Sequence, residues 1–173
     1  MFLQPRQVVS HLSLRRGLTV ADFGAGRGEY SLAVKEAVGN EGAVYAFDVL
    51  PDAVETLHRE RLRRDMENFF TLCTDLNQHL PLKDRLLHCA VVANTLYALS
   101  KRDEFLDELH RVMAPRGRVL MVDWASSFKN MGPREEEVVA AGDAVRLFRA
   151  HGFSVGSMIP AGTHHYAFVA QKV

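Results

Sequence analysis

The chain has 173 residues, 47% of them hydrophobic and 24% charged, and its 21 basic residues balance its 21 acidic residues. This composition is typical of one globular domain with a full core, so we expect a single domain, 1–173, without a separate cap domain. The neutral balance argues against a nucleic-acid partner, which would call for a basic excess or a basic face. No apolar run approaches the ~18 residues of a membrane span and no leader is visible, so a cytoplasmic location without membrane contact is expected.

Helical and strand patterns alternate along the chain. We predict helices at 5–14, 29–38, 52–65, 102–113 and 134–151, and strands at 18–23, 43–48, 69–73, 87–94, 117–124, 153–158 and 164–172. Such alternation predicts a parallel sheet with helices on both faces. Only a short turn at 160–162 separates the last two strands, whereas a parallel return needs about a dozen residues. The last strand is therefore expected to run antiparallel.

The run 20–29 carries the most informative motif. It reads as a short buried strand that leads into a glycine-rich turn and then opens a helix. Gly24, Gly26 and Gly28 let the backbone approach a ligand closely, because no Cβ stands in the way and positive φ is allowed. The free amides at the start of the helix would face that ligand. A dinucleotide fingerprint needs a glycine where this chain has Glu29, which argues against a nicotinamide cofactor.

The spacing Asp22-x-Gly24-x-Gly26-x-Gly28 resembles the first motif of the class I S-adenosylmethionine (AdoMet) methyltransferases. In that family an acidic residue ends the first strand, and the glycines pack under the methionine part of the cofactor. The chemistry of the residues agrees with the resemblance. A carboxylate at Asp22 suits the ammonium and sulfonium of AdoMet better than it suits a pyrophosphate.

A second acidic residue, Asp48, ends the strand predicted at 43–48. A carboxylate at the tip of the second strand can accept both ribose hydroxyls of a nucleoside. The alternative is that Asp48 caps the helix that begins near Pro51, a residue favoured in the first turn. Together with the glycine loop, the position of Asp48 favours ribose binding.

The family resemblance also implies roles beyond the first two strands. Asp75, after the third strand, would hydrogen-bond the adenine amino group, Leu76 would flank the ring, and Val49 or Leu50 would cover its other face. Asn94, after the fourth strand, would bond the cofactor or the backbone of its own loop. The expected cofactor-binding residues are Asp22, Gly24, Ala25, Gly26, Gly28, Asp48, Val49, Asp75, Leu76 and Asn94.

The resemblance extends from about Pro5 to Lys172, and the chain is identified as a member of the small type-11-like AdoMet methyltransferases. This family has an α/β, Rossmann-like, doubly wound fold. Its mostly parallel seven-stranded sheet has the order 3-2-1-4-5-7-6 with the last strand antiparallel. One departure is Arg116, which stands where members usually have the first of two glycines in the turn before the fifth strand. It affects the geometry of that turn.

Candidate catalytic residues follow the later strands. His164, His165 and Tyr97 are the candidates. A near-neutral imidazole of either histidine can take a proton from a hydroxyl, thiol or amine, and Tyr97 is a candidate substrate contact. Structural roles compete with this interpretation, since adjacent strand residues face opposite sides of a sheet. The two cysteines, Cys73 and Cys89, lie in apolar strands and are expected to be buried free thiols, and no metal site is expected.

The leading functional hypothesis is methyl transfer from AdoMet to a small-molecule acceptor that the sequence does not identify. An RNA or protein methyltransferase is one alternative, and a non-catalytic AdoMet-binding scaffold subunit is another. We expect the acceptor pocket to be built from the irregular segment 125–133, the loop after the fourth strand and the first helix. A second copy of the chain or a partner subunit would complete it.

Overall fold

The structure is a computed structural model that describes residues 4–128 and 132–173. Within these ranges seven strands form one sheet in the order β3-β2-β1-β4-β5-β7-β6. The strands are β1 (Thr19–Phe23), β2 (Ala43–Asp48), β3 (Phe69–Cys73), β4 (Leu87–Ala93), β5 (Met113–Trp124), β6 (Phe153–Ile159) and β7 (His165–Lys172). The α-helices are α1 (Pro5–Val9), α2 (Glu29–Val38), α3 (Pro51–Arg63), α4 (Arg102–Val112) and α5 (Ala141–Ala150). Single 3-10 turns are η1 (Ser10–Leu12), η2 (Leu96–Ala98) and η3 (Glu135–Glu137).

The strand pairing confirms the expected topology. Strands β1 to β5 pair in parallel, and β7 runs antiparallel to both of its neighbours, β5 and β6. The carboxyl ends of the parallel strands therefore meet at one edge of the sheet, where the loops that carry function in open α/β folds are found.

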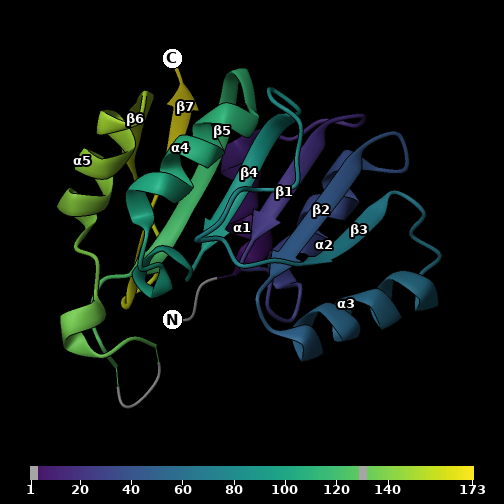
Figure 1. Ribbon diagram of the computed structural model, residues 1–173, viewed down its shortest axis with the longest axis horizontal. Helices are drawn as coiled ribbons and strands as arrows, with labels where there is room; N and C mark the ends of the chain where they lie inside the picture. The colour runs from purple at the N-terminus through teal and green to yellow at the C-terminus, as the bar shows by residue number, and fades with distance from the viewer. Residues whose placement is uncertain (1–3, 129–131) are drawn as a thin grey trace.

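The central strands are apolar on both sides because the sheet is covered on both faces. Along β4, Ala90 and Val92 join the core on the α4 and α5 side, whereas Cys89 and Val91 join the core on the α1 and α2 side. Figure 1 shows α4 and α5 in front of the sheet and α1 and α2 behind it. This alternation follows from the period of two in a β-strand.

Most predicted elements differ from the observed ones by at most two residues at an end, and three differ by more. The helix expected at 134–151 is the turn η3 followed by α5, because Val138 and Ala140, with ψ values of 124° and 145°, leave the helical conformation on either side of the buried Val139. The helix expected at 5–14 is split into α1 and η1. Strand β5 begins at Met113, and the expected turn is a register shift in which Arg116 has a φ of 61°.

One burial prediction is wrong. Cys73 is exposed, whereas Cys89 is buried as expected. Among the strands that the structure describes, β3 lies at an edge of the sheet and pairs with β2 alone, so its last residue has neighbours on fewer sides.

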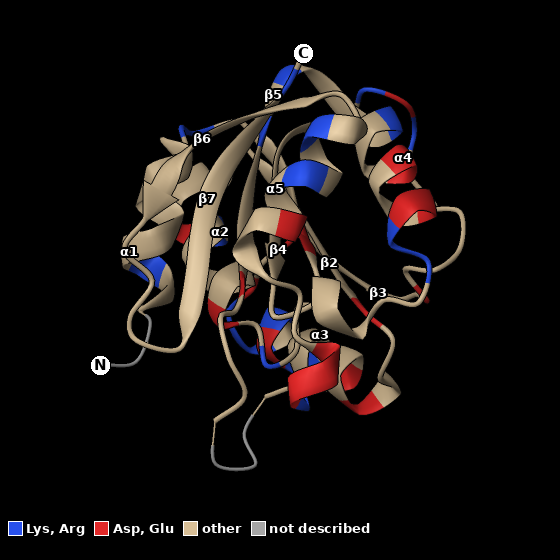
Figure 2. Ribbon diagram, turned by 90° about the vertical axis from the view of Figure 1, so that its left-hand side faces the viewer, with Lys and Arg blue, Asp and Glu red and all other residues tan. Residues whose placement is uncertain are grey.

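Acidic and basic side chains alternate on the charged surface at α3. On α3, Glu60 pairs with Arg63 and Arg64, and Glu55 pairs with Arg59. Figure 2 accordingly shows acidic and basic segments mixed on α3 and α4. These arginines therefore do not form a basic patch free of acidic neighbours. Among the described residues, no helix has the length and apolar character needed to cross a membrane.

Candidate functional site

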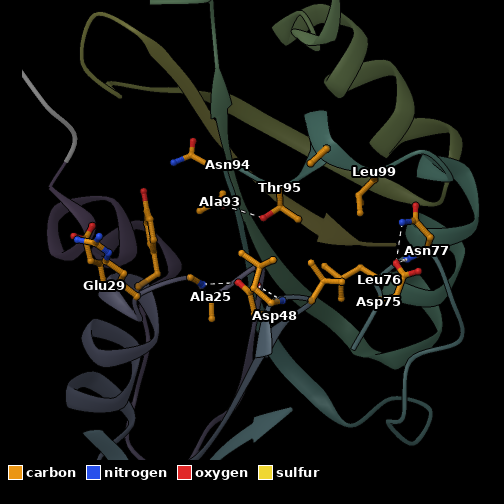
Figure 3. A pocket seen from close by; sticks show the side chains of 17 residues that line it. Ala25, Glu29, Asp48, Asp75, Leu76, Asn77, Ala93, Asn94, Thr95 and Leu99 are labelled. Atoms are coloured by element: carbon orange, nitrogen blue, oxygen red, sulfur yellow. Dashed lines mark hydrogen bonds between the residues drawn. The ribbon is translucent and has the colours of Figure 1, made fainter. Parts of the chain in front are cut away.

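A cavity of about 590 Å³ lies at the carboxyl edge of β1, β2, β3 and β4. That volume is in the usual range for a small-molecule or cofactor site. Figure 3 shows Glu29 at one end, the Asp75 and Asn77 pair at the other, and Asp48 between them. Of the predicted cofactor-binding residues, those that line the cavity are Gly24, Ala25, Gly26, Asp48, Val49, Asp75, Leu76 and Asn94. Asp22 and Gly28 are not among the lining residues.

The glycine loop owes its shape to three left-handed residues. Gly24, Gly26 and Gly28 have φ values of 81°, 52° and 85°. A Cβ on Gly24 would overlap Thr95 and one on Gly28 would overlap Leu57, whereas a Cβ on Gly26 would meet no atom of the described residues within 4 Å. Since Gly26 lines the cavity, that open space is where a ligand would approach the backbone. The loop is thus a cradle that a side chain at Gly26 would fill.

The Asp48 side chain accepts hydrogen bonds from two backbone amides at the cavity, one before and one after it in the chain. Its Oδ2 accepts the Gly26 amide at 2.7 Å, and its Oδ1 accepts the Leu50 amide at 2.9 Å. Each carboxylate oxygen has a further lone pair to offer a ligand hydroxyl. The capping alternative is not seen, because the N-cap of α3 is Leu50 and no side chain caps it.

Asp75 and Asn77 form the far end of the cavity. Asp75 Oδ1 accepts bonds from the amide and the side-chain nitrogen of Asn77, each at 2.9 Å. These bonds hold the pKa of Asp75 below its usual value. Asn77 Oδ1 in turn accepts the amides of Ser100 and Lys101 at 3.0 Å. Asn77 was missed by the sequence analysis, although an Asp-x-Asn turn after a strand is a recognisable signal.

Asp22 lies outside the cavity lining and is buried in the protein. Its Oδ2 accepts the Ser31 hydroxyl at 2.5 Å, and its Oδ1 has no hydrogen-bond partner among the described residues. Burial raises the pKa of Asp22 to about 7, against the opposing effect of Ser31. An unpaired carboxylate oxygen in such a place suits a nearby cation.

Tyr30 is a lining residue that the sequence analysis did not single out. It is the second residue of α2, and its buried hydroxyl has no partner within the described parts of the chain. Burial, with the charges of Asp22 and Glu29, raises the pKa of Tyr30, so its hydroxyl stays protonated and able to donate. Its position two residues after Gly28, in the first turn of α2, was the available signal.

The three candidate catalytic residues do not line the cavity. The His165 ring lies 4.2 Å from the Trp124 ring, and the His164 ring lies 3.9 Å from that of Phe128. Burial, and to a lesser degree His164, lowers the pKa of His165. Tyr97 belongs to η2, next to the lining residues. The segment 125–133 contains residues 129–131, which lie outside the described residues, and the described part holds no cluster of metal-ligating side chains.

Comparisons with known proteins agree with this geometry. A family model described as a methyltransferase domain matches residues 20–117. A crystal structure of a SAM-dependent methyltransferase from Aquifex aeolicus superposes with a TM-score of 0.90 at 29% identity, covering 99% of this chain and 91% of that one.

Two curated relatives are both named ubiquinone/menaquinone biosynthesis C-methyltransferase UbiE. The protein from Salmonella paratyphi B is 25% identical over 99% of this chain and 65% of its own length. The protein from Haemophilus ducreyi is 27% identical over 65% of this chain and 43% of its own length. The chain therefore spans less than two thirds of these relatives.

Proposed function

The chain belongs to the class I AdoMet-dependent methyltransferases, and from this premise we propose that it transfers the methyl group of AdoMet to a small-molecule acceptor. AdoMet is the cofactor of this family. The observation that carries the proposal is the cavity at the carboxyl ends of β1 to β4, with the open cradle at Gly26 and the carboxylate of Asp48 on its floor.

The charges around the cavity support a cationic nucleoside as the ligand. Glu29, Asp48 and Asp75 line it, and Arg27 is its lining cation. The unpaired oxygen of the buried Asp22 adds a further acceptor close by. We assign the ammonium end of AdoMet to the Glu29 side. A pyrophosphate would be repelled by this excess of carboxylates.

The remaining contacts follow from the order of residues along the cavity. Asp48 would accept the ribose hydroxyls through its free lone pairs. The pair of Asp75 and Asn77 would face the adenine amino group, and the side chains of Val49 and Leu76 would enclose the ring. This order, from Glu29 through Asp48 to Asn77, follows the order of methionine, ribose and adenine in AdoMet (Figure 3).

Bound AdoMet supplies an electrophilic methyl group on a sulfonium. The protein's part is to hold the acceptor in line with that methyl and to exclude water. A small molecule is the proposed acceptor because Arg59, Arg63 and Arg64 in and after α3 are each paired with a glutamate, so the described residues there do not form a purely basic surface for RNA. The domain 1–173 is proposed as a single unit, since one sheet carries both cores.

Calorimetric titration of the purified chain with AdoMet, S-adenosylhomocysteine and NAD tests the cofactor site directly. We expect micromolar binding of the first two and none of NAD. Methyl transfer is then tested by following release of S-adenosylhomocysteine over a panel of small acceptors. Failure to bind AdoMet would contradict the proposal. Binding without turnover on any acceptor, alone or with a partner, would favour a non-catalytic AdoMet-binding subunit.

A further inference from the structure

A buried carboxylate outside the cavity is bonded to one of its walls. Asp123, near the end of β5, is 0% exposed. Its Oδ2 accepts the backbone amide of Tyr97 at 3.0 Å, and its Oδ1 accepts the amide of Trp124 at 2.8 Å. Tyr97 lies in η2, and residues on both sides of it line the cavity. Asp123 therefore contacts the wall without contacting the cavity.

Arg102 bonds the carbonyl oxygens of the same turn. Its Nε donates to the carbonyl oxygen of Leu96, and its Nη2 donates to that of Tyr97, both at 2.9 Å. The amide and the carbonyl of Tyr97 are thus each bonded to a charged side chain. A single 3-10 turn has poor internal hydrogen bonds, so such outside anchors decide where it lies.

Asp123 is a carboxylate buried among apolar residues of β5. Val119 and Met121, which share the face of β5 with Asp123, belong to the apolar core. Burying a carboxylate there is costly unless hydrogen bonds compensate it. Burial raises the pKa of Asp123 to about 6, and the hydrogen bonds from the two amides and the charge of Arg102 oppose that rise. An apolar residue at this position would leave the amide of Tyr97 without its acceptor.

We propose that Asp123, together with Arg102, is a positioning residue for cofactor binding. The two side chains hold residues 94–99 in the shape of the cavity wall before AdoMet arrives. Because the loop is already ordered, AdoMet binding loses less conformational entropy. The affinity is therefore higher than for a loop that is ordered only on binding. The inference rests on the proposed function, because it assumes that AdoMet occupies this cavity.

Three variants test the inference. Asp123→Asn keeps one acceptor oxygen and so leaves one amide unpaired, and Arg102→Gln removes the cation that bonds the carbonyl oxygens. Asp107→Asn is the matched control, since Asp107 lies on the same helix as Arg102 but contacts His151, away from the cavity. We expect the Kd for AdoMet to rise about tenfold in Asp123→Asn and several-fold in Arg102→Gln. The control should stay within about twofold of wild type.

Amide hydrogen exchange separates positioning from a general loss of stability. In the wild type, the segment 94–99 should be protected without ligand. In Asp123→Asn and Arg102→Gln it should exchange faster without ligand and regain protection when AdoMet is saturating. Thermal unfolding of all variants is measured in parallel. A rise in Kd that does not correlate with a lower melting temperature indicates positioning and not a general loss of stability. If Asp123→Asn does not fold, Arg102→Gln alone tests the inference, by its Kd for AdoMet and by the hydrogen exchange of segment 94–99.

The outcomes distinguish this inference from the proposed function. A wild-type chain that binds AdoMet, with folded Asp123→Asn and Arg102→Gln variants of unchanged Kd, overturns the positioning role alone. Equal losses of affinity in the control and in these variants would overturn it too. A wild-type chain that does not bind AdoMet overturns the proposed function and this inference with it.

Discussion

Gly24 in the loop after β1 and Thr95 in the loop after β4 are packed directly against each other, and a Cβ on Gly24 would overlap the Thr95 hydroxyl. The Thr95 Oγ1 also lies 3.0 Å from the carbonyl oxygen of Phe23, the residue before the glycine. Two walls of the cavity are therefore joined through a glycine and a hydroxyl. Gly24 is needed both for this close approach and for its φ of 81°.

Three glycine substitutions should distinguish three effects of an added Cβ, which are steric overlap, backbone strain at positive φ and blocking of the ligand. Gly17→Ala should cause backbone strain alone, because Gly17 has a φ of 83° and no atom of 4–128 or 132–173 lies within 4 Å of the added Cβ, so the variant should lose about 1–2 kcal/mol of unfolding free energy. Gly24→Ala adds the overlap with Thr95 and should lose about 1–3 kcal/mol more. Gly26→Ala should resemble Gly17→Ala in stability but weaken AdoMet binding. Urea titration and calorimetry measure the two effects, and equal stability of all three would contradict the argument.

Much of the fold was predictable because it depends on local patterns. The alternation of strands and helices, and the short turn at 160–162, were enough to indicate the parallel sheet and its antiparallel end. The glycine loop and the residues Asp48 and Asp75, at or just after strand ends, could be predicted from the sequence for the same reason. Parallel strands bring their carboxyl ends together, so residues at those ends meet in one cavity.

The rest depends on contacts between distant parts of the chain. No local pattern links Gly24 to Thr95 or Tyr97 to Asp123, because each pair meets only after the sheet has formed. The exposure of Cys73 follows from the edge position of β3, which the apolar strand pattern does not reveal. The break before α5 likewise depends on the burial of Val139 in the core.

Asp48→Ala should weaken AdoMet binding by about 1–3 kcal/mol, because charge-assisted hydrogen bonds to the ligand and to the Gly26 amide are lost together. Asp52→Ala is the control, since Asp52 is an exposed residue in the first turn of α3 that does not line the cavity. Calorimetric Kd values for AdoMet provide the measurement. An affinity equal to that of wild type would rule out the assignment of Asp48 to the ligand.

The two thiols should react very differently. Cys73 is exposed, whereas Cys89 is buried and burial raises the pKa of its thiol. Iodoacetamide should therefore modify Cys73 in the folded protein and reach Cys89 only after unfolding, because the thiolate is the reactive form. Mass spectrometry of native and urea-treated samples measures this, with Cys73→Ser as the control. Rapid labelling of Cys89 in the native state would contradict the core described here.

His151 should make stability depend on pH. Its Nδ1 lies 2.7 Å from Asp107 and its Nε2 lies 3.0 Å from Asp103, which ties the end of α5 to α4. Burial lowers the pKa of His151, but the bonds to the two carboxylates outweigh it, so the pKa is raised. The stabilisation is therefore complete below the unfolded pKa of about 6.5 and is lost as pH rises through the raised folded value.

The measurement for this contact is the free energy of unfolding as a function of pH. In wild type the free energy of unfolding should fall as the pH rises through the raised pKa of His151, and in His151→Gln this fall should be absent. His11→Gln, at an exposed position, should keep the wild-type pH dependence. Because Asp103 and Asp107 are exposed, the difference should shrink at high salt. Identical pH profiles of wild type and His151→Gln would refute the contact.

Asp22 should couple AdoMet binding to proton release. Burial raises the pKa of its carboxyl to about 7, so near that pH a substantial fraction is protonated in the free protein. A cation placed beside its unpaired Oδ1 favours the ionised form and lowers the pKa. Binding at about pH 6.5 should therefore release protons, and the Kd should fall as pH rises from about 6 to 8.

Calorimetry in buffers of different ionisation enthalpy counts the released protons. S-adenosylhomocysteine, which keeps the ammonium group but lacks the sulfonium, should release protons too if the ammonium is the cation that Asp22 meets. Asp22→Asn should bind without proton release and with a flatter pH dependence. A wild-type binding enthalpy that is independent of buffer at about pH 6.5 would show that no cation approaches this carboxylate, and the ammonium end of the cofactor would then belong elsewhere in the cavity.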